Sequence, residues 1–250
     1  MSGVWEDLRR STQARIGLGR AGDALPTDRV LELRAAHAAA RDAVHDPLDA
    51  EAFAARVAAV GLGEPVLVRS RARNRGEYLR RPDLGRVPET LEPVSRTDAD
   101  VGFVLADGLS PRALTRHGVP LLAALAEALS GRYRIAPPVI ATDARVALGD
   151  HVGDALGVGI LLVVIGERPG LSVADSLGIY LTHLPRPGRA DADRNCVSNI
   201  HPPDGLGYRD AARVVSALVD GARRLGRSGV VLKDTSRSVP QAFPATILEL

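Results

Sequence analysis

The sequence predicts an α/β protein, with a mostly parallel sheet and helices on both faces, preceded by a smaller helical N-terminal region. From residue 101 onward, short apolar segments alternate with segments of helical periodicity, which is typical of strands joined by crossover helices. The run GILLVV at 159–164 is apolar throughout, as strands covered on both faces are. We therefore divide the chain into a helical region and irregular connection at 1–100, an α/β domain at 101–234 and an irregular tail at 235–250.

The N-terminal region contains helical patterns only. A helix over 25–47 begins at Pro26-Thr27 and ends before Pro47, and further helices are predicted at 4–9 and 49–60. Residues 63–100 are rich in Arg, Pro and Gly and predict a long connection. Connections of this length are commonly functional or interfacial.

Strands and helices alternate in the predicted α/β domain. Strands are expected at 101–106, 137–142, 159–164, 177–184 and 228–232, and helices at 110–131, 148–156 and 210–225.

Composition excludes several classes of protein. No apolar run in the 250 residues approaches the ~20 needed to span a bilayer. The N-terminus, MSGVWEDLRRS, lacks the apolar segment of a secretory signal. The single cysteine, Cys196, excludes an internal disulfide framework and a cysteine-only zinc site. We expect a cytoplasmic protein without a membrane partner.

A nucleic-acid partner is not expected either, although the pI is about 9.0. The net charge is only +2, and acidic residues are interleaved with basic ones nearly everywhere. The densest basic run, RSRARNR at 69–75, has few aromatic neighbours on which bases could stack. An RNA-binding protein, the alternative, would bind with a strong dependence on salt.

The usual catalytic motifs are missing from the sequence. It contains no GxGxxG after a strand, no GxxxxGK[ST], no HExxH, no paired CxxC and no GxSxG. Six histidines are scattered without ligand spacing, and none is placed beside Cys196. We therefore predict no catalytic residue and no metal ligand in this chain.

The stretch IGERPGLS at 165–172 directly follows a predicted buried strand. Ligands of open α/β sheets bind outside the carboxyl ends of the strands, which is where Glu167 and Arg168 fall. Pro169-Gly170 suits a fixed turn, and Arg145-Val146 follows a neighbouring strand. Position alone does not distinguish a ligand-binding pair from an Arg–Glu pair that only closes a loop.

Six blocks of the sequence carry a more specific signal: DLRRSTQARIGLGRAG at 7–22, HAAARDAVHDPLD at 37–49, RVALGD at 145–150, GERPGLSVADSLGIYLTHLPR at 166–186, DADRNCVSNIHPPDGLGY at 191–208 and SGVVLKD at 228–234. In this order they resemble the small subunit of ethanolamine ammonia-lyase, over residues 6–234.

The resemblance implies an adenosylcobalamin-dependent lyase of two kinds of subunit, which converts ethanolamine to acetaldehyde and ammonia by a radical mechanism. A large barrel subunit would hold the substrate, and the small subunit would close a Rossmann-like domain over the cobalamin in a hetero-oligomer of large/small pairs. The family's cobalamin-contacting positions fall here on Val146, Glu167 and Cys196. Because the cofactor carries the radical chemistry, the small subunit needs no catalytic residues of its own.

Elementary chemistry suits these three positions. A corrin ring is rimmed by amide side chains whose N–H groups need acceptors once water is removed. An ionised Glu167 only accepts hydrogen bonds, and Arg168 could neutralise it or hold it in place. Val146 offers backbone polar groups, and Cys196 is suited to packing. Weaker candidates for the same rim are Asp193, Arg194 and Asn199.

Two points stay open at this level. A cobalamin- or nucleotide-binding sensor without a catalytic partner is the alternative function, and an adjacent gene for a barrel subunit would distinguish the two. Longer members of the family carry an N-terminal extension linked to packaging in a bacterial microcompartment. This chain begins almost at the common region, which leaves a microcompartment location open.

Overall fold

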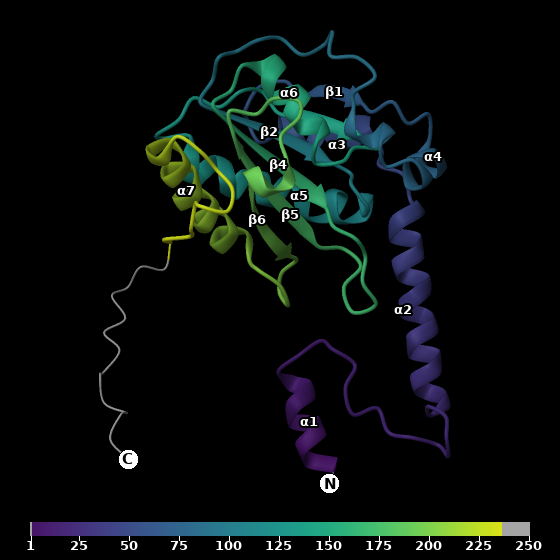
Figure 1. The fold of residues 1–250 in the computed structure, drawn as a ribbon. Coiled ribbons are helices and arrows are strands. Elements are labelled where there is room, and N and C mark those ends of the chain that lie inside the picture. Colours follow the sequence, from purple (N-terminus) through teal and green to yellow (C-terminus); the bar gives the residue numbers. More distant parts are fainter. Residues whose placement is uncertain (1, 237–250) are drawn as a thin grey trace, which may run out of the picture.

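The computed structural model describes residues 2–236 as a six-stranded sheet flanked by helices (Figure 1). Its elements are α1 (Ser2–Arg10), α2 (Thr27–His45), α3 (Ala50–Ala58), β1 (Val66–Arg69), α4 (Arg75–Arg80), η1 (Leu84–Arg86), β2 (Val101–Ala106), α5 (Pro111–Leu129), β3 (Val139–Thr142), α6 (Leu148–Leu156), β4 (Ile160–Gly166), β5 (Leu177–His183), η2 (Asp191–Asp193), β6 (Arg194–Ile200) and α7 (Tyr208–Leu225). None of the helices in this part of the chain is long and apolar enough to cross a membrane.

Local sequence signals fix the ends of the two helices nearest the sheet's centre. The Ser110 side chain accepts a hydrogen bond from the backbone N–H of Ala113, and Pro111 occupies the first turn of α5. Helix α6 ends at Gly157, whose φ of 71° lies in the left-handed region that glycine adopts at low cost. The prediction of a helix over 148–156 is confirmed to the residue.

The sheet is mixed, with the strand order β1-β3-β2-β4-β5-β6. Strands β1, β3, β2 and β4 are parallel, whereas β5 and β6 are antiparallel to their neighbours. The prediction of a mostly parallel sheet is therefore confirmed in part: four strands are parallel to one another, and the antiparallel pairings of β5 and β6 make the sheet mixed. The physical reason is the connection 167–176, which is too short to contain the crossover that a parallel neighbour of β4 would require.

Three strand predictions need correction. Strand β1 lies within the connection predicted at 63–100, β6 lies in a segment for which no element was predicted, and residues 228–232 form a turn instead of the predicted strand. Gly229 adopts a φ of 91°, and Val230 is 69% exposed, so this apolar segment faces away from the core. The backbone N–H of Gly229 and the hydroxyl of Ser228 bond to side-chain and backbone oxygens at the start of β6, which holds the turn there.

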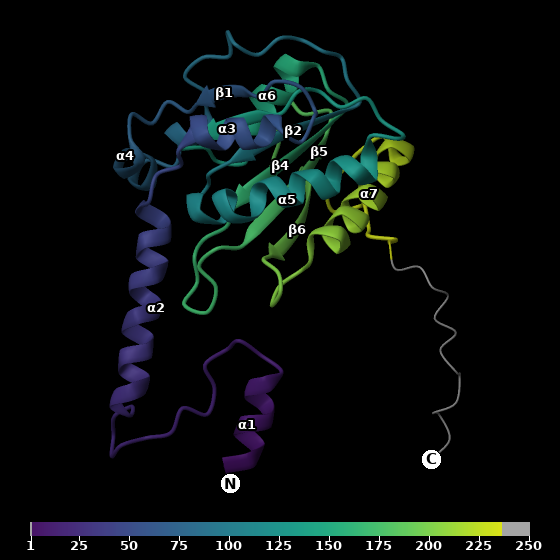
Figure 2. The same cartoon turned by 180° about the vertical axis from the view of Figure 1, so that it is seen from behind.

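Helices cover the two faces of the sheet unequally. Helices α5 and α7 pack on one face, as Figure 2 shows, and they share the main apolar core of the protein. Helix α6 packs on the other face, over β2 and β4. On that second face β5 and β6 lie in front of α5 (Figure 1). Val197 of β6 belongs to the core under α5 and α7, so its exposed neighbour Cys196, opposite Tyr180 of β5, points to this second face. Part of the sheet is thus open beside α6.

Helix α2 extends away from the sheet, and α1 lies near its far end (Figures 1 and 2). Ala43 is the one buried residue of α2 among those described. The N-terminal segment touches the β4–β5 loop, where Arg15 donates a 2.8 Å hydrogen bond to the carbonyl of Leu171. The division of the chain at residue 100 stays a prediction, and residues 237–250 of the predicted tail lie outside the described chain.

Candidate functional site

A pocket of about 410 Å³ lies at the carboxyl edge of the sheet, where β2, β3 and β4 end and β5 begins. The chain passes from β2 to β3 on one side of β2 and returns to β4 on the other, so the strand order reverses here. Such a reversal is the usual ligand-binding position of α/β sheets. The pocket is lined by Tyr78, Gly108, Leu109, Arg145, Val146, Ile165, Gly166, Glu167, Arg168 and Tyr180.

Glu167 both closes a loop and presents a free oxygen. Its Oε2 accepts a 2.7 Å hydrogen bond from the hydroxyl of Ser176 and a 3.2 Å bond from the backbone N–H of Asn199. Its Oε1 lies against Gly178, where an added Cβ would approach within 2.9 Å. Within the described chain no hydrogen bond uses Oε1. This oxygen is available as an acceptor.

A bulge in β6 directs the backbone N–H of Asn199 toward the carboxylate of Glu167. The pairing of β5 with β6 shifts in register between Leu177 and Ile179, so β6 carries additional residues there. Asn199 adopts a φ of 62°, a conformation that asparagine tolerates better than most residues. Its side-chain oxygen lies 2.8 Å from Nε2 of His201, which is buried. The bulge in β6 therefore holds the carboxylate of Glu167, which follows β4, through a hydrogen bond from Asn199.

Val146 lies half-buried in the loop between β3 and α6. The carboxylate of Asp107, at the end of β2, accepts hydrogen bonds from the backbone N–H groups of Asp143 and Ala144, at 2.8 and 3.0 Å. Burial raises the pKa of Asp107 to about 6, opposed by the nearby charge of Arg75. No hydrogen bond among the described residues uses the backbone N–H of Val146. The Asp107 carboxylate thus holds the start of the loop, and Val146 lines the pocket.

Cys196 reaches the same region through Tyr180, its cross-strand neighbour. Desolvation raises the pKa of Tyr180 to about 12, and the thiol of Cys196 adds to this shift. Desolvation also raises the pKa of the Cys196 thiol, which the hydroxyl of Tyr180 lowers and the charge of Glu167 raises again. The thiol therefore stays protonated near neutral pH, which suits packing and not nucleophilic attack.

The structure thus brings together the three residues predicted from the sequence. Val146 and Glu167 line one pocket with Tyr180, and Cys196 lies beside Tyr180 on the open sheet face. The sequence analysis did not identify Tyr180 as a site residue. The alternation of LGIYLTHL would have placed its side chain on the less buried face of β5. That these residues bind a cofactor stays a prediction.

The sequence left open whether an Arg168–Glu167 pair only closes the loop, and over residues 2–236 the structure shows no such ion pair. Arg168 is exposed. Ser176 closes the loop in its place. Among the weaker candidates, Asp193 accepts a hydrogen bond from the backbone N–H of Ala190. The backbone N–H of Asn199 donates a hydrogen bond to Glu167.

The third weaker candidate, Arg194, is committed to the protein interior. Its guanidinium pairs with Asp150 of α6 at 2.6 Å, both side chains being 2% exposed, and it donates to the hydroxyl of Thr182. This buried pair joins β6 to α6, directly below the open face that carries Cys196.

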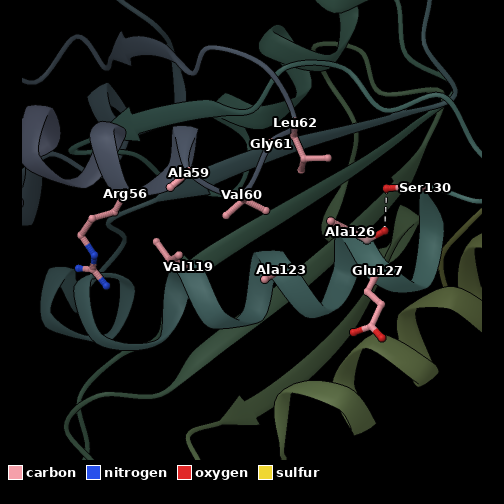
Figure 3. Close-up of a pocket in the computed structure, with 10 residues that line it drawn as sticks. All are labelled: Arg56, Ala59, Val60, Gly61, Leu62, Val119, Ala123, Ala126, Glu127 and Ser130. Carbon is pink, nitrogen blue, oxygen red and sulfur yellow. Dashed lines mark hydrogen bonds between the residues drawn. The ribbon is translucent and has the colours of Figure 1, made fainter.

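A second hollow, of about 580 Å³, lies between α3 and α5 and is apolar apart from Arg56, Glu127 and Ser130 (Figure 3). The Ser130 hydroxyl is already bonded to the carbonyl of Ala126, at 2.7 Å. Arg56 donates to the carbonyl of Thr115, at 2.9 Å. None of the predicted site residues lines this hollow, so the pocket at the carboxyl edge is the candidate site.

Comparison of the sequence with known proteins identifies the family of this chain. The family model described as ethanolamine ammonia-lyase light chain matches residues 2–233. A relative from Rhodococcus erythropolis, named ethanolamine ammonia-lyase small subunit, is 69% identical over 234 residues, which cover 94% of this chain and 91% of the relative. A second relative with that name, from Ralstonia nicotianae, is 46% identical over 241 residues, covering 93% of this chain and 88% of the relative. The chain therefore belongs to the ethanolamine ammonia-lyase light-chain family, a family of lyase small subunits whose name implies a large-subunit partner.

Proposed function

We propose that this chain closes a Rossmann-like domain, residues 101–234, over adenosylcobalamin and against the barrel of a large subunit that converts ethanolamine to acetaldehyde and ammonia. The observation that carries the proposal is the gathering of Val146, Glu167 and Cys196 around Tyr180 at the carboxyl edge of the sheet. These positions come from three distant parts of the sequence.

The chemistry of the edge fits a corrin. The free Oε1 of Glu167 accepts from an amide N–H of the corrin rim, and the free backbone N–H of Val146 donates to an amide carbonyl. The open face of β5 and β6 beside the pocket offers room for a ring larger than the pocket itself, with the small side chain of Cys196 beneath it. The Glu167 side chain is fixed in position by Ser176 before the cofactor arrives, so little ordering is required on binding.

The proposal gives the cofactor, the large subunit and this chain separate roles. When bound, the cofactor supplies a radical through cleavage of its cobalt–carbon bond, and the large subunit holds the substrate. This chain binds the cofactor, orients it and excludes water from one side.

Reconstitution tests the proposal. The chain should be produced alone, with the large subunit, and the large subunit alone, each supplied with adenosylcobalamin and ethanolamine. Release of ammonia is expected only from the mixture of both subunits. Turnover by the isolated chain, or by the large subunit without it, would refute the assigned role.

A further inference from the structure

The pocket at the carboxyl edge keeps a positive charge that its own residues do not neutralise. It is lined by two arginines, Arg145 and Arg168, and by one carboxylate, Glu167. Over residues 2–236, neither arginine lies within 4.0 Å of an acidic oxygen, while Glu167 is bonded to Ser176 and Asn199. A ligand with one negative charge would balance the lining.

Arg145 is held in place on the protein side. Its backbone N–H donates a 2.8 Å hydrogen bond to the carbonyl of Gly85, and its guanidinium lies 4.6 Å from the centre of the Tyr78 ring. An added Cβ on Gly85 would come within 2.7 Å of that ring and 3.0 Å of Cγ of Arg145. A stacked guanidinium keeps its edge free for hydrogen bonds, so Arg145 is preorganised for a ligand.

The terminal nitrogens of Arg145 are the donors left for that ligand. Its Nε is buried and has no hydrogen-bond partner. No hydrogen bond of the described residues uses its terminal nitrogens either, and the side chain lines the pocket. Arginine pairs with phosphate oxygens through parallel N–H donors, more strongly than with a neutral amide.

We propose that Arg145, assisted by the more exposed Arg168, binds the phosphodiester of the cofactor's nucleotide tail. The inference rests on the proposed function and assigns a different part of the cofactor to Glu167 and to Arg145. The amides of the corrin rim are neutral and suit Glu167, whereas the phosphodiester is the anionic group of the tail. Tyr78 and Gly85, from the segment 63–100, then act as positioning residues for Arg145.

The test compares adenosylcobalamin with adenosylcobinamide, which lacks the phosphodiester, ribose and base. Dissociation constants are measured by the absorbance of the bound corrinoid, in complexes of this chain with the large subunit. Arg145→Gln should weaken binding of adenosylcobalamin by about 10- to 100-fold, the range for a lost charged hydrogen bond. The same variant should change adenosylcobinamide binding less than about threefold, because the partner group is absent.

Two further variants keep the test decisive. Arg145→Lys retains the charge but not the parallel donors, so it should weaken adenosylcobalamin binding less than Arg145→Gln does and leave adenosylcobinamide binding unchanged. Arg86→Gln, the matched control, replaces an exposed arginine next to Gly85 that does not line the pocket, and both affinities should stay as in the wild type. Equal losses for both corrinoids in the Arg145 variants, or no loss for either, overturn the phosphodiester assignment. Failure of the wild-type complex to bind either corrinoid overturns the proposed function instead.

Discussion

Ser176 and Glu167 face each other across the ends of β5 and β4, and the Ser176 hydroxyl donates a 2.7 Å hydrogen bond to Oε2 of Glu167. With the backbone N–H of Asn199 as a second donor, this arrangement uses one carboxylate oxygen to close the β4–β5 loop and leaves the other facing Gly178. The two readings of Glu167 that the sequence left open, loop closure and ligand binding, therefore concern different oxygens of the same side chain.

The two roles of Glu167 can be separated by substitution. Glu167→Leu should raise the cofactor's Kd in the assembled complex, because the corrin amide donors stay buried without an acceptor, at about 1–3 kcal/mol for each. Ser176→Ala removes a donor to Oε2 only and should raise the Kd less. Isothermal titration of both variants against adenosylcobalamin provides the measurement. Unchanged cofactor affinity in a properly assembled Glu167→Leu complex would leave Glu167 with loop closure alone.

Cys196 should pack against the cofactor and take no chemical part. Its thiol has a raised pKa, so it is protonated near neutral pH. Cys196→Ala should weaken cofactor binding modestly and leave turnover at saturating cofactor within about tenfold, which corresponds to ~1.4 kcal/mol in the barrier. The check is kcat for ammonia release at saturating cofactor, with Cys196→Ser as the control of similar size. A loss of several orders of magnitude in both variants would instead indicate a chemical role.

The buried pair of Arg194 and Asp150 should be costly to break and cheaper to replace. Asp150→Leu leaves the buried guanidinium of Arg194 with only the exposed Asp191, 3.7 Å from its Nε, and the free energy of unfolding should fall by about 3–5 kcal/mol. The double variant Asp150→Leu, Arg194→Met removes both charges and should recover most of that loss. Urea unfolding of the isolated chain measures both. If the single and double variants are equally destabilised, the packing around these residues matters more than their charges.

Asp107 should make stability depend on pH in an unusual direction. Its pKa is raised from 3.8 to about 6 in the folded chain, so between these values the folded state binds more protons than the unfolded state. The free energy of unfolding therefore contains a contribution, on the order of 3 kcal/mol, that is present below pH 4 and lost as the pH rises through 6. Asp107→Asn should abolish this part of the pH dependence. Denaturant melts of both proteins between pH 4 and 7 provide the comparison, and parallel profiles would contradict the shifted pKa.

Particular residues show how far the sequence predicts this fold and site. Continuous apolar runs and caps such as Ser110 sufficed for the central strands and for α5, α6 and α7. The antiparallel direction of β5 was predictable from the connection 167–176, because its length excludes a crossover helix. Strand β6 was hidden, since the bulge at Asn199 breaks the alternation of DRNCVSNI. Val230 and Val231 suggested a strand because residue type alone does not show whether a neighbouring strand is available.

The site shows the same contrast. Glu167 follows a recognisable strand, so its position at the sheet edge was predictable. The roles of Val146 and Cys196 came from resemblance alone, and Tyr78, Arg145 and Asp107 meet only through tertiary packing. Segment 63–100 supplies Tyr78 to the candidate pocket, and its functional or interfacial role, predicted from its length, stays a prediction. Its strand β1 and helix α4 were too short to leave a periodic signal.

In the proposed complex the cofactor lies at the carboxyl edge of the sheet. The most direct measurement uses nitroxide labels on a Cys196→Ala chain, at Leu171→Cys in the β4–β5 loop or Leu184→Cys at the opposite end of β5, both exposed positions. Relaxation of each nitroxide by cob(II)alamin in the assembled complex reports its distance from the cobalt. Because the seven residues of β5 span roughly 20 Å at ~3.3 Å each, the label at 184 should lie farther from the cobalt by on the order of 10 Å. A cobalt that lies nearer to the label at 184 would contradict a cofactor position at the carboxyl edge.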